Sequence, residues 1–249
     1  MPDTVENSTP NNRLIIFDFD GTLVDSQRLI VECMTVAFAN HNLPVPPANA
    51  VRRSVGLALE RAIASLLPDP DDFDLAALVS ESYRQRAYAI RHSDEFDEPL
   101  FEGAREAIIA LNAPEIWLGI ATGKNRRGLL HSLEYHGLHH HFATLKTADD
   151  GPSKPHPEIL HQAMAETGVA PEDTVMIGDT TYDMQLARNA GARAIGVSWG
   201  YHGGEELLAN GAARVVANFA ELLDELKAGN AVTKPAGENA GNATGVLAK

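Results

Sequence analysis

Two aspartates follow an apolar run near the start of the chain, in the stretch LIIFDFDGT at residues 14–22. The two-residue spacing of Asp18 and Asp20 places both carboxylates on one side of an extended strand. Open α/β sheets bind ligands at the carboxyl ends of their strands, and carboxylates there are costly to desolvate unless a cation compensates them. The alternative is that Asp-Gly-Thr only ends the strand as a turn. The second carboxylate after an uninterrupted apolar run favours a functional pair.

A second acidic pair occurs in VMIGDTTYD at residues 175–183, where Asp179 again ends an apolar run. Asp183 falls in the first turn of a predicted helix, and a carboxylate there also suits the helix dipole, which is the alternative explanation for it. Three or four carboxylates converging from two strands, without His or Cys, predict an oxygen-rich site. Such a site suits Mg²⁺, which prefers oxygen ligands.

A phosphate site in this protein needs local positive charge, because 20 Lys and Arg against 34 Asp and Glu give a net charge of −14. Lys154 lies in SKPHPE at residues 153–158, where two prolines stiffen the chain and fix its direction. Thr122 ends the apolar run at residues 118–122, and its hydroxyl and the following backbone N–H groups can bind phosphate oxygens. The alternatives are an ordinary surface lysine and an ordinary strand-to-helix turn.

Short and nearly continuous apolar runs predict buried parallel strands that are covered on both faces. The predicted strands are Leu14–Phe19, Ile116–Ala121, Thr174–Ile177, Ala194–Val197 and Arg214–Val216. The helical segments between them lie at about residues 103–112, 126–136, 157–167, 182–190 and 204–210. This alternation predicts an α/β fold with a doubly wound, mainly parallel open sheet.

The segment between about residues 25 and 96 has only helical patterns, over Ser26–Asn42, Ser54–Leu67 and a periodic series at residues 75–83. A right-handed crossover between parallel strands normally needs one helix, so an inserted all-helical domain is favoured over helices that cover one sheet face. The predicted division is a discontinuous core at residues 13–24 and 97–228, a helical domain at 25–96, and disordered tails at 1–12 and 229–249.

These segments, in this order, resemble the haloacid dehalogenase-like superfamily, with its Rossmann-like core, and in particular its members with a helical cap inserted after the first strand. The similarity spans about residues 13–228. Its most specific parts are DFDGTLVDS at residues 18–26 and GDTTYD at 178–183. The enzymes called phosphoglycolate phosphatases are similar in further details, since they share Lys-Pro-x-Pro and a Trp-Gly-Tyr like that at residues 199–201.

The resemblance implies a phosphatase that works through an aspartyl phosphate. Asp18 would attack phosphorus, and Asp20 would protonate the leaving oxygen and later activate water. A carboxylate suits the first role because it is ionised at neutral pH and needs no activating base. The groups implied to bind the phosphoryl oxygens are Thr122 and Lys154. The implied ligands of Mg²⁺ are Asp18, Asp20 through its backbone carbonyl, Asp179, and Asp183 as a ligand or close neighbour.

The resemblance also implies which residues border the substrate. Those beside the phosphate would be Gly21, Thr22, Gly123 and Lys124. In the cap, Arg52 and Arg53 adjoin residues 54–57, where the family has a loop that enters the site. An arginine there would suit a substrate carboxylate such as that of glycolate. A solvated helix face is the alternative for each arginine.

Three functions stay open at this point: hydrolysis of a small phosphomonoester such as phosphoglycolate, a sugar-phosphate mutase like the β-phosphoglucomutases, and an inactive phosphate-binding module. Asp20 argues against a dehalogenase, because dehalogenases of the family lack this second aspartate. No lysine occurs between Asp20 and Lys124, so the cap has none to form the Schiff base of a phosphonatase.

The composition argues against several kinds of partner. Nucleic acids and anionic membranes bind basic surfaces, and this chain is strongly acidic. No apolar run approaches the roughly 18 residues of a membrane span, and no signal peptide is visible. The single cysteine, Cys33, is expected in the core. We expect a cytoplasmic monomer or homodimer that binds a small phosphorylated metabolite.

Overall fold

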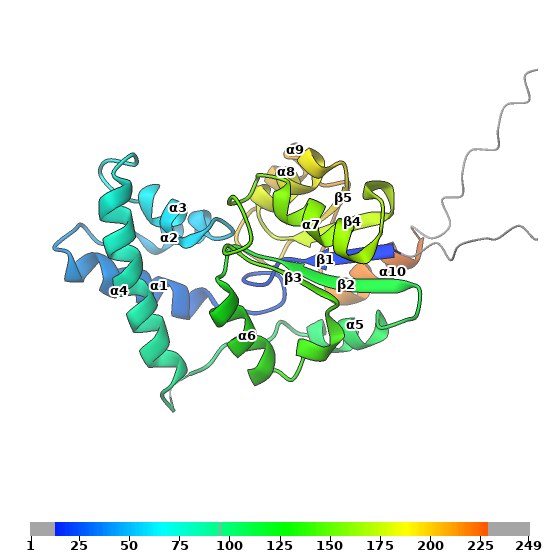
Figure 1. The fold of residues 1–249 in the computed structure, drawn as a ribbon, viewed down its shortest axis with the longest axis horizontal. Helices are drawn as coiled ribbons and strands as arrows, with labels where there is room; N and C mark the ends of the chain where they lie inside the picture. Colours follow the sequence, from blue (N-terminus) through cyan, green and yellow to red (C-terminus); the bar gives the residue numbers. More distant parts are fainter. Residues whose placement is uncertain (1–12, 95, 229–249) are drawn as a thin grey trace, which may run out of the picture.

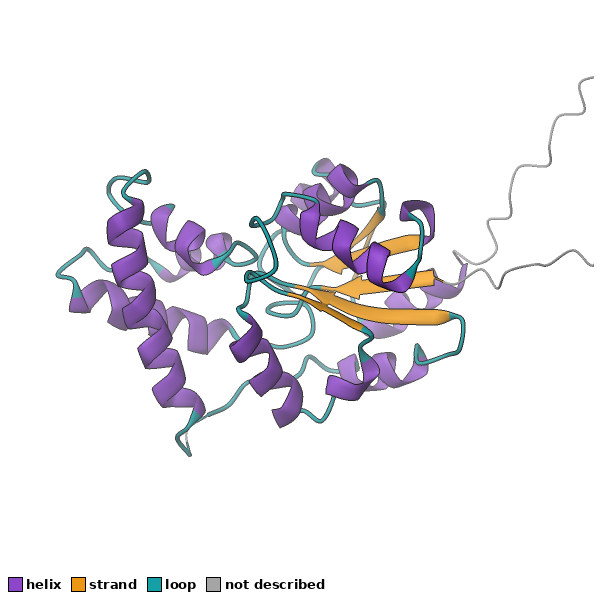
Figure 2. Ribbon diagram, in the orientation of Figure 1, coloured by secondary structure: helices purple, strands orange, loops and turns teal. Residues whose placement is uncertain are grey.

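A six-stranded parallel sheet lies at the centre of the computed structural model, which describes residues 13–94 and 96–228 (Figures 1 and 2). Its strand order is β3-β2-β1-β4-β5-β6. The strands are β1 (Arg13–Phe17), β2 (Ile116–Ala121), β3 (Thr144–Lys146), β4 (Thr174–Gly178), β5 (Arg193–Val197) and β6 (Arg214–Val216). The two predicted tails, residues 1–12 and 229–249, lie outside the described residues.

The central strand β1 explains why its sequence is apolar throughout instead of alternating. Successive side chains of a strand point to opposite faces. Ile15 and Phe17 accordingly join one hydrophobic cluster, and Leu14 and Ile16 join another on the opposite face. All four side chains are fully buried. A strand with both faces covered needs an apolar residue at every position, as the sequence predicts.

Helices cover both faces of the sheet (Figure 2). Those packed on the first face are α5 (Ala104–Ala110), α6 (Arg126–Tyr135) and α10 (Phe219–Ala228). Those packed on the second are α7 (Glu158–Thr167), α8 (Thr181–Ala190) and α9 (Gly204–Ala209). Two short 3₁₀ turns, η1 (His139–His141) and η2 (Pro171–Asp173), complete the core. The predicted doubly wound α/β fold is therefore confirmed.

Four helices between β1 and β2 pack chiefly on one another, beyond the carboxyl ends of the strands (Figure 1). They are α1 (Gln27–Asn40), α2 (Ala48–Ser54), α3 (Leu59–Ala64) and α4 (Phe73–Arg91). Their own core includes Phe38, Ile63 and Val79. The described residues between 25 and 96 form no strand. We call residues 25–96 the cap and keep the predicted division between cap and core as a working definition.

The structure corrects some predicted elements. The helix expected over Ser54–Leu67 is wrong, because α2 ends at Ser54 and α3 begins at Leu59. Gly56 between them has a φ of 97°, a conformation that favours glycine and ends a helix. The sequence pattern does not predict strand β3, because the strand is short and includes a lysine. Lys146 is buried, and its ammonium forms an ion pair with Glu166. Helix α10 was also missed.

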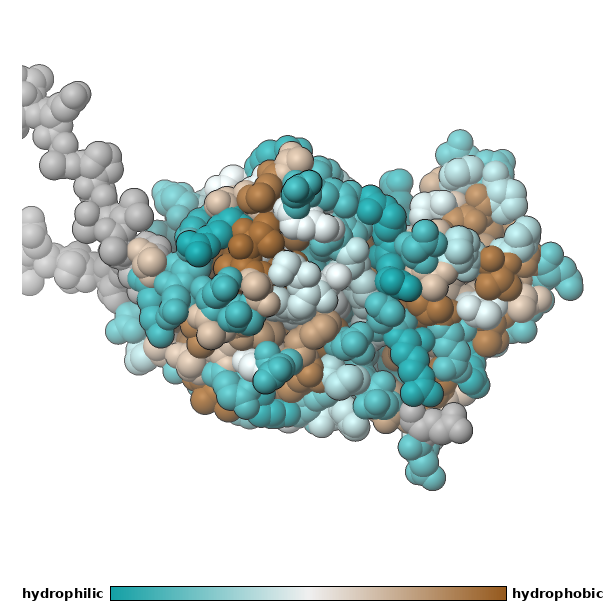
Figure 3. Space-filling view, turned by 180° about the vertical axis from the view of Figure 1, so that it is seen from behind, coloured by the Kyte–Doolittle hydropathy of each residue, from teal (hydrophilic) through white to brown (hydrophobic). Residues whose placement is uncertain are grey.

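Most of the large apolar side chains of the described residues are buried, and few of them reach the surface. On the face shown in Figure 3, hydrophilic residues predominate and apolar residues form small groups. None of the helices in the described ranges combines the length and the apolar character that crossing a membrane requires.

We expect Phe38→Ala to lower the free energy of unfolding by about 3–5 kcal/mol, because truncating a fully buried phenylalanine leaves a cavity in the cap. Phe73→Ala is the matched control, since Phe73 is 49% exposed and surface substitutions change stability by only about 0.5 kcal/mol. Urea unfolding of both variants measures the difference. Equal losses would contradict a packed cap core around Phe38.

Candidate active site

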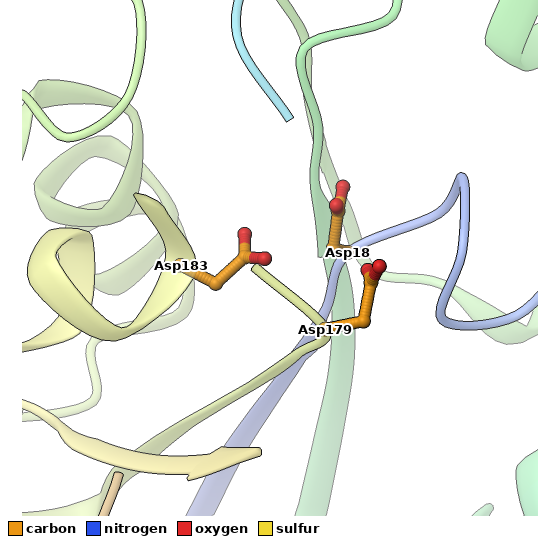
Figure 4. Close-up of side chains that lie close together, drawn as sticks. All are labelled: Asp18, Asp179 and Asp183. Atoms are coloured by element: carbon orange, nitrogen blue, oxygen red, sulfur yellow. The ribbon is translucent and has the colours of Figure 1, made fainter. Parts of the chain in front are cut away.

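Three buried aspartates meet where β1 and β4 end (Figure 4). Asp18 follows β1, and Asp179 follows β4, its parallel neighbour in the sheet. Asp183 lies one turn later, near the start of α8. Each residue is fully buried, and one carboxylate oxygen from each lies within 4.8 Å of the others. Adjacent parallel strands thus bring together acids that are about 160 residues apart in the chain.

The chain orients Asp179 and Asp183 with hydrogen bonds. Thr22 Oγ1 donates to Asp179 Oδ1 over 2.9 Å, and the backbone N–H of Tyr201 donates to Oδ2 over 2.8 Å. The backbone N–H and hydroxyl of Thr180 both donate to Asp183 Oδ2, at 3.0 and 2.7 Å. This is a capping box, so the start of α8 and the site share one set of bonds.

Close packing also explains one glycine beside the cluster. Gly21 has a φ of 88°, and a Cβ atom there would lie 2.4 Å from Asp179 Oδ2. Any larger residue would be strained in this conformation and would push the carboxylate away. Gly21 therefore allows the turn after Asp20 to pass directly beside the acidic cluster.

Lys154 supplies the positive charge of this cluster. Its Nζ lies 2.6 Å from Asp183 Oδ1 and 3.0 Å from Asp18 Oδ1. Burial alone would lower the pKa of Lys154, but Asp18 and Asp183 together raise it above its usual value. Burial raises the pKa of Asp18 to about 7 even though Lys154 opposes the change. Burial, followed by the charges of Asp18 and Asp183, also raises the pKa of Asp179 well above its usual value.

The charges of the cluster do not balance. Three carboxylates surround one ammonium, and neither oxygen of Asp18 has a hydrogen-bond partner within the described residues. Three buried carboxylates with a single ammonium among them are costly unless a further cation joins them. The donors are all oxygens, which suits a hard divalent ion such as Mg²⁺. The residues present therefore fit a metal site.

Asp20 belongs to a separate ion network. Lys124 Nζ donates to Asp20 Oδ1 over 2.7 Å and to Glu98 Oε1 over 3.0 Å. Burial favours a lower pKa for Lys124, but the charges of Asp20 and Glu98 outweigh it and raise that pKa. The ammonium also lies 5.4 Å from the centre of the Phe19 ring. Lys124 is thus tied to Asp20 and fixes where its carboxylate points.

Glu98 was not predicted. It is fully buried, yet its surroundings in the sequence, Asp-Glu-Pro-Leu, belong to no apolar run or helical period that would mark it. A buried carboxylate needs a partner, and Lys124 is that partner. Only the fold brings the two together.

A cavity of about 570 Å³ lies between the cap and the core. Asp18, Asp20, Thr122, Gly123 and Lys124 line its core side, as expected for residues beside a substrate phosphate. The loop at residues 55–58 lines its cap side. The predicted site residues that do not line it are Gly21, Thr22, Lys154, Asp179 and Asp183. Of these, Thr22 contacts Asp179 and so positions an acid of the cluster.

Arg52 and Arg53 do not line the cavity either, so their expected contact with the substrate is not found in this structure. The guanidinium of Arg53 instead donates two hydrogen bonds to Glu206 on α9, at 2.6 and 3.2 Å. Tyr182 Oη donates to the backbone carbonyl of Arg53 over 3.4 Å. His202 Nε2 lies equally far from that carbonyl. Arg53 therefore links the cap to the core.

His202 can donate to the carbonyl of Arg53 because of its second nitrogen. Its Nδ1 accepts a hydrogen bond from the backbone N–H of Thr181 over 3.1 Å. In the neutral ring the proton then resides on Nε2, which makes this nitrogen the donor. Burial lowers the pKa of His202 and so favours the neutral form.

The loop between α2 and α3 brings the cap to the edge of the site. The backbone N–H of Ala58 donates to Ser153 Oγ over 2.8 Å. A Cβ atom on Gly123 would lie 2.3 Å from the carbonyl oxygen of Leu57. Only glycine at position 123 allows the two backbones to approach so closely, which gives the predicted Thr-Gly turn a structural reason.

Comparison with known proteins agrees with this geometry. Residues 15–197 match the family model described as haloacid dehalogenase-like hydrolase. A protein of Dickeya dadantii called "Probable phosphatase IndB" is 33% identical over 211 residues, which are 84% of this chain and 91% of that protein. A phosphoglycolate phosphatase of Vibrio vulnificus is 29% identical over 223 residues, with 85% and 95% of the two chains covered.

A solved structure is similar in fold over most of the chain. The crystal structure of a hydrolase from Pseudomonas syringae superposes with a TM-score of 0.77 at 27% sequence identity. The match covers 87% of this chain and 99% of the other.

We expect Asp18→Asn to raise the melting temperature of the metal-free protein at pH 8. The pKa of Asp18 is about 7 in the folded protein and about 4 in an unfolded chain. The folded state therefore binds the proton more tightly, and the stability of the wild type falls as pH rises through this interval. Each 1 kcal/mol recovered corresponds to about 2–4 °C in a chain of this size.

Thermal unfolding in a chelator at pH 5 and pH 8 measures the effect, which should shrink at the lower pH. Asp224→Asn is the control, because the Asp224 side chain is 82% exposed and should give no such dependence. Added Mg²⁺ should stabilise the wild type more than Asp18→Asn, since it binds the folded state. A melting temperature of Asp18→Asn below that of the wild type in chelator at pH 8 would contradict the excess of buried negative charge.

Proposed function

This chain belongs to the haloacid dehalogenase-like hydrolases, and from that membership we propose that it hydrolyses a small phosphomonoester with Asp18 as the nucleophile and Mg²⁺ as the cofactor. The observation that carries the proposal is the state of Asp18. Its carboxylate lies at the cavity wall, both oxygens lack hydrogen-bond partners, and Lys154 lies 3.0 Å away. An unsolvated carboxylate beside a fixed cation is suited to attack a phosphoryl group.

The first half of the reaction uses Asp18 and Asp20. An oxygen of Asp18 forms a bond to phosphorus while the bond from phosphorus to the ester oxygen breaks. Asp20 gives its proton to that oxygen, and the alcohol leaves. Lys124 holds Asp20 in place through the 2.7 Å hydrogen bond. The product of this half is an aspartyl phosphate on Asp18.

The second half regenerates the enzyme. Asp20, now ionised, takes a proton from water as the water oxygen attacks phosphorus, and the bond between phosphorus and Asp18 breaks. Inorganic phosphate leaves and Asp20 is again protonated. Thr122 and Lys154 are the groups that would bind phosphoryl oxygens, and both are buried within the same end of the sheet. Splitting the displacement in two lets a single acid–base group serve both halves.

Mg²⁺ would be held by Asp18, Asp179 and the backbone carbonyl of Asp20. When bound, it supplies positive charge to the phosphoryl oxygens. Asp183 is better suited to a supporting role, because protein groups already donate to both of its oxygens. Its contact with Lys154 keeps that ammonium beside Asp18.

The relatives support the class of substrate. The relative from Vibrio vulnificus is called a phosphoglycolate phosphatase, and the relative from Dickeya dadantii is called a probable phosphatase. We therefore propose a small phosphorylated metabolite as the substrate of this chain. A cytoplasmic location and a monomeric or homodimeric state are part of the same proposal and stay predictions.

Release of inorganic phosphate from a panel of phosphomonoesters in the presence of Mg²⁺ tests the function. The panel includes phosphoglycolate, nucleotides, sugar phosphates and pyrophosphate, and sugar phosphates are also analysed for isomerised product. We expect Asp18→Asn to lose activity by more than about a hundredfold, and Asp20→Asn by about 10²–10⁴-fold. Asp224→Asn is the control. Residual turnover of a few per cent in Asp18→Asn would contradict its role as the nucleophile.

Glu98→Gln should lower kcat by roughly 10–100-fold with little change in KM, because a small displacement of a catalytic group is costly. The variant weakens the anchor of Lys124 and so the orientation of Asp20, without touching the substrate. Steady-state kinetics separate the two constants. Glu102→Gln, at an exposed position four residues away, is the matched control. A rise in KM at constant kcat would instead place Glu98 in ground-state binding.

A further inference from the structure

Among the cations that line the cavity, Arg91 has neither a role in the proposed reaction nor an ion-pair partner within the described residues. Arg91 is the last residue of α4, and its side chain lines the cavity from the cap side. A Cβ atom on Gly128 of α6 would lie 3.4 Å from Arg91 Nη2. The guanidinium thus lies against a position where the core has no side chain, and Gly128 leaves the room for it.

Arg91 differs from the other cations that line this cavity. Lys124 is paired with Asp20 and Glu98, and Arg84 is paired with Glu60 over 3.0 Å. The guanidinium carbon of Arg127 lies 4.6 Å from the centre of the Tyr88 ring.

The guanidinium of Arg91, by contrast, forms no hydrogen bond or ion pair with any residue in the described ranges, and its Nε atom is buried without a hydrogen-bond partner. A half-buried guanidinium without a partner is unfavourable. It is also unexpected in a protein with 34 acidic residues and 20 basic ones.

The charge of Arg91 acts inside the cavity. Burial lowers the pKa of His131, another lining residue, and Arg91 lowers it further. The charge of Arg91 also opposes the rise in the pKa of Lys124. Arg91 therefore acts on the end of the cavity where Lys124 contacts Asp20. Three acids line the cavity besides Asp18 and Asp20. Glu60 is occupied by Arg84 and Asp149 by the backbone N–H of Arg126, while Glu134 is exposed and forms no ion pair with Arg91 in the described part of the chain.

Part of the cap wall is apolar. Leu29, Ile30 and Met34 of α1 line it together with Leu57 and Leu59. The volume of about 570 Å³ lies within the range of roughly 300–1,000 Å³ that holds ligands of drug size. A phosphate ester of a two-carbon acid would leave much of this space, and most of the apolar wall, to water.

We propose that the substrate is a phosphomonoester of an apolar carboxylic acid, whose carboxylate binds Arg91 while its phosphoryl group lies at Asp18. The proposal rests on the proposed phosphatase function and narrows its substrate class. A guanidinium binds a carboxylate through two parallel hydrogen bonds. Arg127 also lacks an ion pair in the described part of the chain, but it is exposed, which leaves Arg91 as the partly buried cation without one. A single such cation matches one negative charge, so a carboxylate is favoured over a second phosphate. The apolar wall covers the part of the molecule between the two charged ends.

The test compares 4-carboxyphenyl phosphate with 4-nitrophenyl phosphate, which have nearly the same shape and differ in the charge of the para group. Arg91→Met should lower kcat/KM about 10–100-fold for the carboxylate ester, as expected for losing a hydrogen bond to a charged group. It should change kcat/KM for the nitro ester by less than about threefold. Arg91→Lys should restore part of the lost preference. Arg84→Met, which removes a paired cation from the same helix and cavity, should affect both esters alike.

The ratio of the two kcat/KM values is measured on one protein preparation, so partial unfolding of a variant cancels. Equal losses for both esters in Arg91→Met, or no loss for either, would overturn the proposal. A larger loss for 1,4-phenylene bisphosphate than for 4-carboxyphenyl phosphate would overturn the choice of a carboxylate. Hydrolysis of both esters by the wild type, with no selective loss for the carboxylate ester in Arg91→Met, would remove this inference and leave the phosphatase function standing. No hydrolysis of any ester would remove both.

Discussion

The buried excess of negative charge at the ends of β1 and β4 is the constraint on which the rest of the site depends. Asp18, Asp179 and Asp183 share one lysine, so the fold must hold like charges close together against their repulsion. It does so with a helix cap, with the Thr22 hydroxyl and with the backbone N–H of Tyr201. In the proposed function, a divalent cation would bind there and offset part of this repulsion, beside the phosphoryl group of the substrate. Activity and stability are therefore opposed within the same few residues.

The two aspartates of the first motif are chemically alike and only two residues apart, yet the fold gives them different surroundings. Asp18 is unsolvated and its oxygens are free of hydrogen bonds. Asp20 is held by an ammonium that Glu98 anchors from behind. Two carboxyl groups in distinct environments can serve as nucleophile and as acid–base group without competing for one role. Lys154 and Lys124 each serve one of these aspartates, which keeps the two networks separate.

Much of this arrangement could be predicted from the sequence, because it depends on local patterns. Continuous apolar runs predict covered parallel strands, and parallel strands bring their carboxyl ends to one edge, so Asp18 and Asp179 are expected at the same edge of the sheet. The strand order, with β1 beside β4, then makes them neighbours. Glu98 and Arg91 could not be predicted in this way. Glu98 pairs with Lys124, a distant residue of the core, whereas Arg91 lines the cavity from the cap without an ion pair in the described part of the chain. No local period of the sequence records either environment. Arg53 lies in the predicted segment but faces Glu206 on another helix. The apolar pattern over Ser54–Leu67 predicts one helix. The left-handed backbone conformation of Gly56 interrupts that helix and forms the loop after α2.

The contacts of Arg53 have a consequence for the rate at which the enzyme can turn over. With substrate enclosed between cap and core, ligand exchange requires these contacts to break. The ion pair between Arg53 and Glu206 has side chains that are 58% and 34% exposed, and such pairs contribute only about 0–1 kcal/mol. The hydrogen bonds from Tyr182 and His202 to the same residue are long, at 3.4 Å. Contacts of this kind add little resistance to cap opening, and lid motions of enzymes typically occur on the microsecond-to-millisecond scale. The edge of the cap at Arg53 is therefore held weakly, while the 2.8 Å hydrogen bond from Ala58 to Ser153 holds the loop beside the cavity.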